Sequence, residues 1–123
     1  VDGPYYDQGA TREAINYFED FLILFPEHPD VKEGEDGLAE MKSVEAQSQM
    51  LKGDFYFYKW KDLRAAKVFY NEAITTAPES REAELAKEKL AIIDTKMQEV
   101  VDMIRDSLVP TSDDEGVVDP TKF

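Results

Sequence analysis

The sequence has no cysteine among its 123 residues, a single histidine, and no apolar run long enough to cross a bilayer. The lack of cysteine excludes disulfides and thiolate metal sites within these residues, but it does not distinguish the cytosol from an oxidising compartment. A membrane-spanning helix needs about 20 mainly apolar residues, so none is predicted. The first residues also lack the basic and then apolar stretch of a signal peptide. We therefore expect a cytoplasmic protein, or one whose leader has been removed.

Basic residues are also scarce, with 14 lysines and arginines against 27 acidic residues and a formal net charge of -13. This charge repels the phosphates that supply most nucleic-acid affinity, so no nucleic-acid partner is expected. It also opposes direct insertion into anionic membranes, while a lipid anchor in a missing N-terminal region stays compatible with it. The 42% hydrophobic and 33% charged fractions are typical of a folded globular domain. Because the chain starts at Val1, within the turn-like stretch that ends at Pro4, we expect N-terminal repeats to be missing.

Two stretches of the chain are similar to each other, residues 13–26 and residues 65–78. A single offset places apolar and proline positions of the first on those of the second: Ala14 on Ala66, Phe18 on Tyr70, Leu22 on Ile74, and Pro26 on Pro78. The same offset places Leu38 on Leu90, so the similarity continues past the proline. The sequence therefore contains an internal repeat.

Apolar residues within each stretch recur every three or four positions, which is the spacing of an amphipathic helix. Thr11 and Asp62 stand where N-caps are expected for the first and third helices, and prolines follow both helices. Asp30 and Glu33 predict a capping box for a second helix over about 30–59, with glycines at which it could fray. A fourth helix is predicted from near Ser80 to a stop at Pro110.

The predicted buried faces of the two longer helices follow the same spacing. That of the second helix comprises Leu38, Met41, Val44, Ser48, Leu51, Phe55 and Tyr58. That of the fourth helix comprises Ala83, Ala86, Leu90, Ile93, Met97, Val100, Ile104 and Leu108. Lone helices are marginal in water, so each must bury its apolar stripe against its neighbours. The predicted fold is an all-α, TPR-like α-solenoid of stacked antiparallel helix pairs over 1–109, with units of about 5–52 and 53–108 and an acidic, flexible tail over 110–123.

The chain resembles tetratricopeptide repeats, in which small residues let paired helices approach, an aromatic fills the gap, and a proline ends the second helix. Ala14, Phe18 and Pro26, and again Ala66, Tyr70 and Pro78, occupy these roles. The spacing between units exceeds the usual period of about 34 residues. With this longer spacing and the Phe25–Pro26 and Ala77–Ser80 endings, the chain is similar to the C-terminal repeats of BamD-type outer-membrane-protein assembly lipoproteins.

That resemblance, over roughly 5–93, implies a periplasmic, outer-membrane-associated lipoprotein, while the residues themselves leave the cytoplasm open. It also implies a scaffold whose partners are other proteins, either assembly subunits or substrates, and whose C-terminal repeats dock partner subunits. Two alternatives stay open, a general TPR-like adaptor and a self-associating structural module whose long final helix pairs with a copy of itself.

Basic residues crowd around the expected turn between the second and third helices, together with the only tryptophan: Lys52, Lys59, Lys61, Arg64, Lys67 and Trp60. Tryptophan and arginine are enriched at interface hot spots, so we predict partner binding by Phe57, Lys59, Trp60, Lys61 and Arg64. Four successive aromatic residues over 55–58 must face all around a helix, and Phe57 is expected to be the exposed one. The alternative is ordinary packing, with lysine stems along the helix surface and Trp60 against the neighbouring pair.

No catalytic, cofactor or metal site is predicted, and we expect no enzymatic activity. His28 lies between prolines in a turn and is expected to be an exposed loop residue. The carboxylates Glu33, Glu35, Asp36 and Glu40 do not follow the spacing of a calcium-binding loop and are expected to form a solvated helix face.

Overall fold

The computed structural model describes residues 8–108, and all the regular secondary structure in this range is helical. Its elements are α1 (Gln8–Leu24), α2 (Val31–Asp54), a π-helical turn η1 (Phe55–Trp60), α3 (Leu63–Thr76) and α4 (Arg81–Leu108). The all-α prediction is therefore confirmed for the described residues. The predicted acidic tail over 110–123 lies outside them. None of the described helices is long and apolar enough to cross a membrane.

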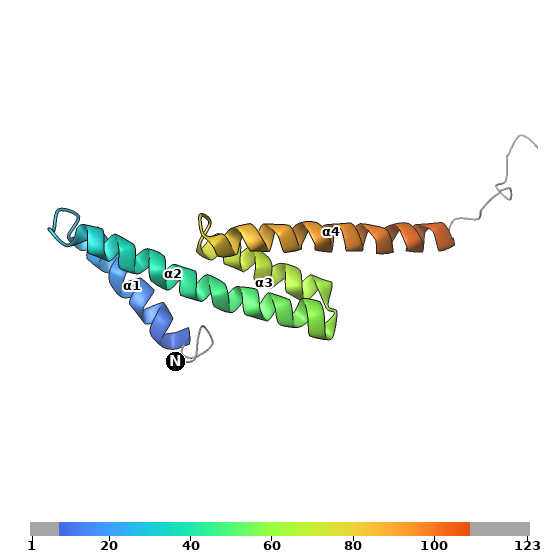
Figure 1. The fold of residues 1–123 in the computed structure, drawn as a ribbon, viewed down its shortest axis with the longest axis horizontal. Coiled ribbons are helices and arrows are strands. Elements are labelled where there is room, and N and C mark those ends of the chain that lie inside the picture. The colour runs from blue at the N-terminus through green and yellow to red at the C-terminus, as the bar shows by residue number, and fades with distance from the viewer. Residues whose placement is uncertain (1–7, 109–123) are drawn as a thin grey trace, which may run out of the picture. The chain divides into compact units, whose positions relative to one another are not determined.

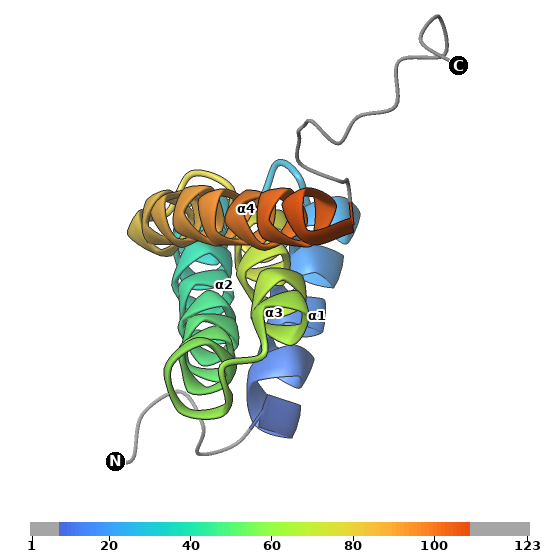
Figure 2. The same cartoon turned by 90° about the vertical axis from the view of Figure 1, so that its right-hand side faces the viewer.

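The chain divides into two compact units, Val1–Leu90 and Ala91–Phe123. The described part of the first unit holds α1, α2, η1, α3 and the first turns of α4. Figure 1 shows α1 and α3 each running alongside α2, and Figure 2 shows the same helices from one end. The described part of the second unit is the remainder of α4, from Ala91 to Leu108.

Helix starts follow the capping predictions in only some places. Asp62 accepts a hydrogen bond from the Ala65 N–H at 3.0 Å and caps α3, as predicted. Ser80 caps α4 in the same way, through a 3.1 Å hydrogen bond from the Ala83 N–H. The capping box at Asp30 is wrong, because the side chain of Asp30 makes no capping hydrogen bond. The N-cap at Thr11 is also wrong, because α1 begins at Gln8 and Thr11 lies within its first turns.

The turns that follow α1 and α3 have the same backbone geometry. Their hydrogen bonds form two equivalent pairs: Phe25 N to Phe21 O (2.9 Å) with Ala77 N to Ala73 O (3.1 Å), and His28 N to Phe25 O (3.1 Å) with Ser80 N to Ala77 O (3.1 Å). Each donor and acceptor in one turn maps onto its counterpart in the other at the offset of the internal repeat. The similarity of the two stretches is therefore one of conformation as well as of residue type.

Three glycines in α2 mark close approaches to aromatic rings and do not interrupt the helix. A Cβ added at Gly37 would lie 2.5 Å from the Phe18 ring of α1, and one added at Gly53 would lie 2.5 Å from the Tyr70 ring of α3. Gly34 likewise lies against α1. The expected fraying is wrong because the missing side chains are replaced by packed rings from the neighbouring helices.

The buried face of α2 differs from the predicted apolar stripe. Its most buried segment includes the polar residues Glu45, Ser48 and Gln49, of which only Ser48 was predicted to be buried, whereas Leu51 is 38% exposed. Helix α1 supplies partners for two of them, since Arg12 pairs with Glu45 and the Gln8 amide donates to the Ser48 hydroxyl at 2.7 Å. Both α1 and α3 contact α2, so its middle is covered on more than one side and polar side chains are buried with it.

Helix α4 keeps only the first part of its predicted buried face. In the first unit Ala83 and Ala86 are fully buried, and the Ser43 hydroxyl of α2 donates to the Glu82 carboxylate at 3.1 Å. In the second unit Ile93 is buried, but the later positions are exposed, with Val100 at 48%, Ile104 at 53% and Leu108 at 76%. The predicted stripe is therefore wrong beyond Met97, which is half-buried.

Candidate protein-interaction surface

The end of α2 widens into a π-helical turn before the chain reverses into α3. The backbone N–H of Lys61 donates to the Tyr56 carbonyl five residues earlier, and the Asp62 N–H donates to the same oxygen at 2.9 Å. Lys61 has a φ of 55°, a left-handed conformation that is uncommon outside glycine. Asp62 then caps α3. This sequence of contacts fixes the backbone that carries the predicted site residues, and π-helical turns occur frequently at functional sites.

Two of the aromatic residues in the π turn face inward onto α3. The ring of Tyr56 stacks on Phe69 with centroids 5.5 Å apart and an interplanar angle of 7°. Phe57 meets Tyr70 edge to face at 6.5 Å. The Tyr70 hydroxyl donates to an Asp54 carboxylate oxygen at 2.5 Å. Burial, followed by this hydrogen bond, raises the pKa of the Tyr70 hydroxyl well above its usual value.

The other aromatic residues of the turn face outward. Phe55 is 45% exposed and Trp60 is 63% exposed, and their rings meet edge to face at 6.1 Å. Tyr58 is also exposed, with the Lys89 ammonium 4.6 Å from its ring centroid. The expectation that Phe57 is the exposed member is therefore wrong, because Phe57 is half-buried. The expectation that Phe55 and Tyr58 belong to the core is also wrong, because both side chains are exposed.

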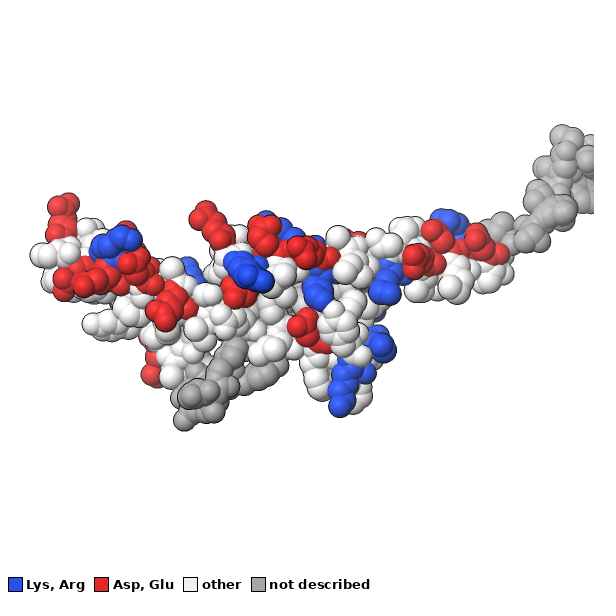
Figure 3. Space-filling model, viewed as in Figure 1, with Lys and Arg blue, Asp and Glu red and all other residues white. Residues whose placement is uncertain are grey.

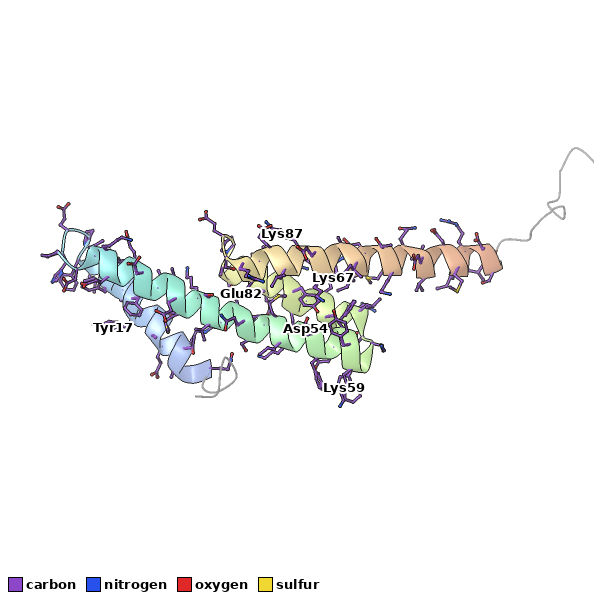
Figure 4. The ribbon with its side chains drawn as sticks, in the orientation of Figure 1. Tyr17, Asp54, Lys59, Lys67, Glu82 and Lys87 are labelled. Atoms are coloured by element: carbon purple, nitrogen blue, oxygen red, sulfur yellow. The ribbon has the colours of Figure 1, made fainter. Side chains whose placement is uncertain are left out.

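Three cations lie close in sequence to this outward aromatic pair. Lys59, Lys61 and Arg64 are all exposed, and none of them forms an ion pair within residues 8–108. The Lys59 side chain extends away from the ribbon in Figure 4. We call the surface formed by Phe55, Lys59, Trp60, Lys61 and Arg64 the hairpin tip.

The hairpin tip differs in charge from the rest of the molecule. Between Lys52 and Lys67 the chain carries five basic and two acidic residues, a local net charge of +3 against -13 for the whole sequence. Figure 3 shows basic side chains gathered at the end of the α2–α3 hairpin and acidic side chains over the beginning of α2. Four of the five predicted site residues are therefore exposed around the α2–α3 turn, together with Phe55, which sequence periodicity had assigned to the core.

The other polar groups that the sequence singled out are weaker candidates for a functional site than the hairpin tip. His28 is exposed in the α1–α2 turn, as predicted, and its Nδ1 accepts a hydrogen bond from the Asp30 backbone N–H at 3.0 Å. The carboxylates of Glu33, Glu35, Asp36 and Glu40 are exposed. Among the described residues, no group of three or more histidine or acidic side chains is arranged to hold a metal ion.

An open hollow of about 510 Å³ lies where α2 faces the α3–α4 turn. Its apolar lining comes from Ala39, Ala77 and Pro78, beside the polar residues Lys42, Thr76, Glu79 and Ser80. Its lysine, Lys42, already has a partner in Glu19, with an N to O distance of 3.7 Å. The hairpin tip, where the cations have no such partner, is therefore the stronger candidate for recognition.

Comparison with known proteins adds no relative. No protein-family model, curated protein or solved structure matches this chain.

Proposed function

We propose that this chain is a non-enzymatic protein–protein interaction scaffold, and that it serves in outer-membrane protein assembly. The observation that carries the proposal is the hairpin tip, where exposed aromatic and basic side chains stand on a backbone fixed by the π turn and the Asp62 cap. Aromatic residues and arginine are enriched in the buried centres of protein interfaces. The place in outer-membrane assembly rests on the resemblance of the repeats to BamD-type lipoproteins.

The aromatic pair of the tip offers enough apolar surface to anchor a partner. Covering the exposed parts of Phe55 and Trp60 would remove on the order of 200 Å² from water, which corresponds to about 5 kcal/mol before the cost of association. Their edge-to-face contact already restricts both rings. A partner would therefore lose little additional side-chain entropy on this surface.

The test is affinity purification from native cells with quantification of the co-purified proteins. The Phe55→Ala/Trp60→Ala variant should lose the specific partners, whereas Tyr17→Ala should keep them. Tyr17 is a suitable control because it is an aromatic residue of the first unit with 67% exposure, away from the tip on α1. A partner set that is the same for both variants would contradict the proposal.

The compartment is tested separately, by fractionating native cells and probing accessibility from the periplasm. Association with the outer membrane and recovery of β-barrel assembly subunits would support the assembly role. A cytoplasmic location with unrelated partners would leave a general adaptor and remove the assembly role.

A second candidate function is self-association through the last turns of α4. Apolar side chains are exposed there, with Val101 at 52%, Met103 at 66% and Ile104 at 53%. Water-exposed apolar faces of this kind mark association surfaces. Sedimentation over a range of concentrations separates the two functions, because self-association requires a dimer that Ile104→Glu dissociates, whereas an adaptor for other proteins remains a monomer.

A further inference from the structure

We infer that the partner segment recognised by the hairpin tip is an acidic peptide that carries an aromatic or aliphatic anchor residue. This inference rests on the proposed function and specifies the chemistry of its partner. The relevant groups are the three cations without ion pairs and the exposed ring pair.

The cations at the tip are available to a ligand. Elsewhere in the first unit, exposed lysines such as Lys32 and Lys87 have intrahelical carboxylate partners, at 3.0 Å and 3.4 Å. Lys59, Lys61 and Arg64 have none within the described residues, although the chain holds an excess of carboxylates. Carboxylates from a partner can therefore approach them without displacing an existing ion pair.

The surrounding charge determines where an acidic ligand can bind. A body with a net charge of -13 repels acidic segments from most of its surface, and the local charge of +3 attracts them to the tip. Complementary charge of this kind contributes more to orientation and association rate than to affinity. Binding should therefore weaken as salt increases.

The ring pair specifies the second part of the ligand. Phe55 and Trp60 present apolar surface in the same stretch of chain as Lys59 and Lys61, so a purely charged ligand would leave this surface in water. An apolar residue next to the acidic ones would cover it. Long polyanions and anionic bilayers fit less well, because they would also meet the acidic body.

The experiment uses Trp60, the only tryptophan of the chain, as an internal reporter. Three synthetic heptapeptides are titrated while the emission of Trp60 is followed: Glu-Asp-Glu-Phe-Glu-Asp-Glu, the same peptide with Gln and Asn in place of Glu and Asp, and the same peptide with Lys at all acidic positions. We expect saturable binding of the acidic peptide with a blue shift of emission, at least tenfold tighter than the neutral one, and weakening at least fivefold between 50 mM and 300 mM salt.

Charge-reversal variants locate the binding. Lys59→Glu/Arg64→Glu should weaken the acidic peptide at least tenfold and leave helicity unchanged. Lys32→Glu/Arg81→Glu makes the same change in net charge away from the tip and should weaken it less than twofold. Equal losses in both variants would overturn the local recognition and leave only a general charge effect.

The remaining outcomes separate this inference from the function on which it rests. Tighter binding of the neutral or basic peptide, with the same shift of Trp60, would overturn acidic recognition and retain a protein-binding tip. No response to any of the three peptides, together with a blue shift on vesicles of phosphatidylglycerol, would overturn both and assign the tip to a membrane surface. No response to peptides or vesicles would also overturn the inference.

Discussion

Substitution of Gly53 by alanine tests whether the contact between α2 and α3 is as close as the structure indicates. Gly53 is buried in the last turn of α2, against the ring of Tyr70. A methyl group there would lie 2.5 Å from one ring carbon and 2.7 Å from another. Real Cβ atoms do not approach other atoms so closely, so the ring or the helix would have to move.

The ring has little freedom to move. Tyr70 is fully buried, and its hydroxyl donates to Asp54, which lies one residue from Gly53. Alanine would gain about 1 kcal/mol from its higher helix propensity. Overpacking costs about 1–3 kcal/mol, and part of the hydrogen bond to Asp54 would be lost as well. We therefore expect Gly53→Ala to lower the free energy of unfolding by about 1–2 kcal/mol.

The assay is urea unfolding followed by circular dichroism at 222 nm. The control places Gly53→Ala in a Tyr70→Leu background, where the smaller side chain leaves room for the methyl group. In that background the substitution should stabilise the chain by up to about 1 kcal/mol. A stabilising effect of Gly53→Ala in the original chain would refute the close packing of α2 on α3.

Two further predictions concern stability. Asp62→Ala should cost about 1 kcal/mol because it removes the cap of α3, whereas Asp30→Ala should cost less because its side chain caps nothing; thermal melts of both variants compare them. The raised pKa of Tyr70 means that the folded chain keeps a proton that an unfolded tyrosine loses at about pH 10. Its stabilising contribution is therefore present below about pH 10 and lost above it, with a slope approaching 1.4 kcal/mol per pH unit. Urea midpoints between pH 9 and 11 should show this decline, and Tyr70→Phe should reduce it.

The helices could be predicted from the sequence because their signals are local. Apolar residues at steps of three and four, prolines after the ends of α1 and α3, and Asp62 before α3 depend only on neighbouring residues. The same holds for the repeated turns, whose residues match at one offset. The predicted bounds of the repeat units and the stacking of helix pairs into a solenoid stay predictions.

The buried face of α2 could not be predicted because it depends on two neighbours at once. Glu45, which was not predicted to be buried, has its ion-pair partner in Arg12 of α1, more than 30 residues away in the chain. No periodic pattern in α2 carries that information. The prediction that α2 frays at its glycines was wrong for a similar reason. The sequence gives the free-energy cost of glycine within a helix, but it does not show which rings pack on the glycines.

The position of the candidate site residues around the turn between α2 and α3 could be predicted from the sequence, but the orientation of the aromatic residues could not. The basic cluster and Trp60 identify the turn between α2 and α3 without any structure. The prediction for Phe57 assumed α-helical rotation, whereas the π turn has hydrogen bonds that span five residues and changes the direction in which each ring points. Phe55 and Tyr58 are exposed as a result.

The matching turns after α1 and α3 have an evolutionary consequence. Because both junctions use equivalent backbone donors and acceptors, a duplicated segment can join the chain at either place without a new connection having to arise. The end of the α2–α3 hairpin lies away from both junctions. Selection could then alter the residues at one end without affecting the joints that hold the helices in order.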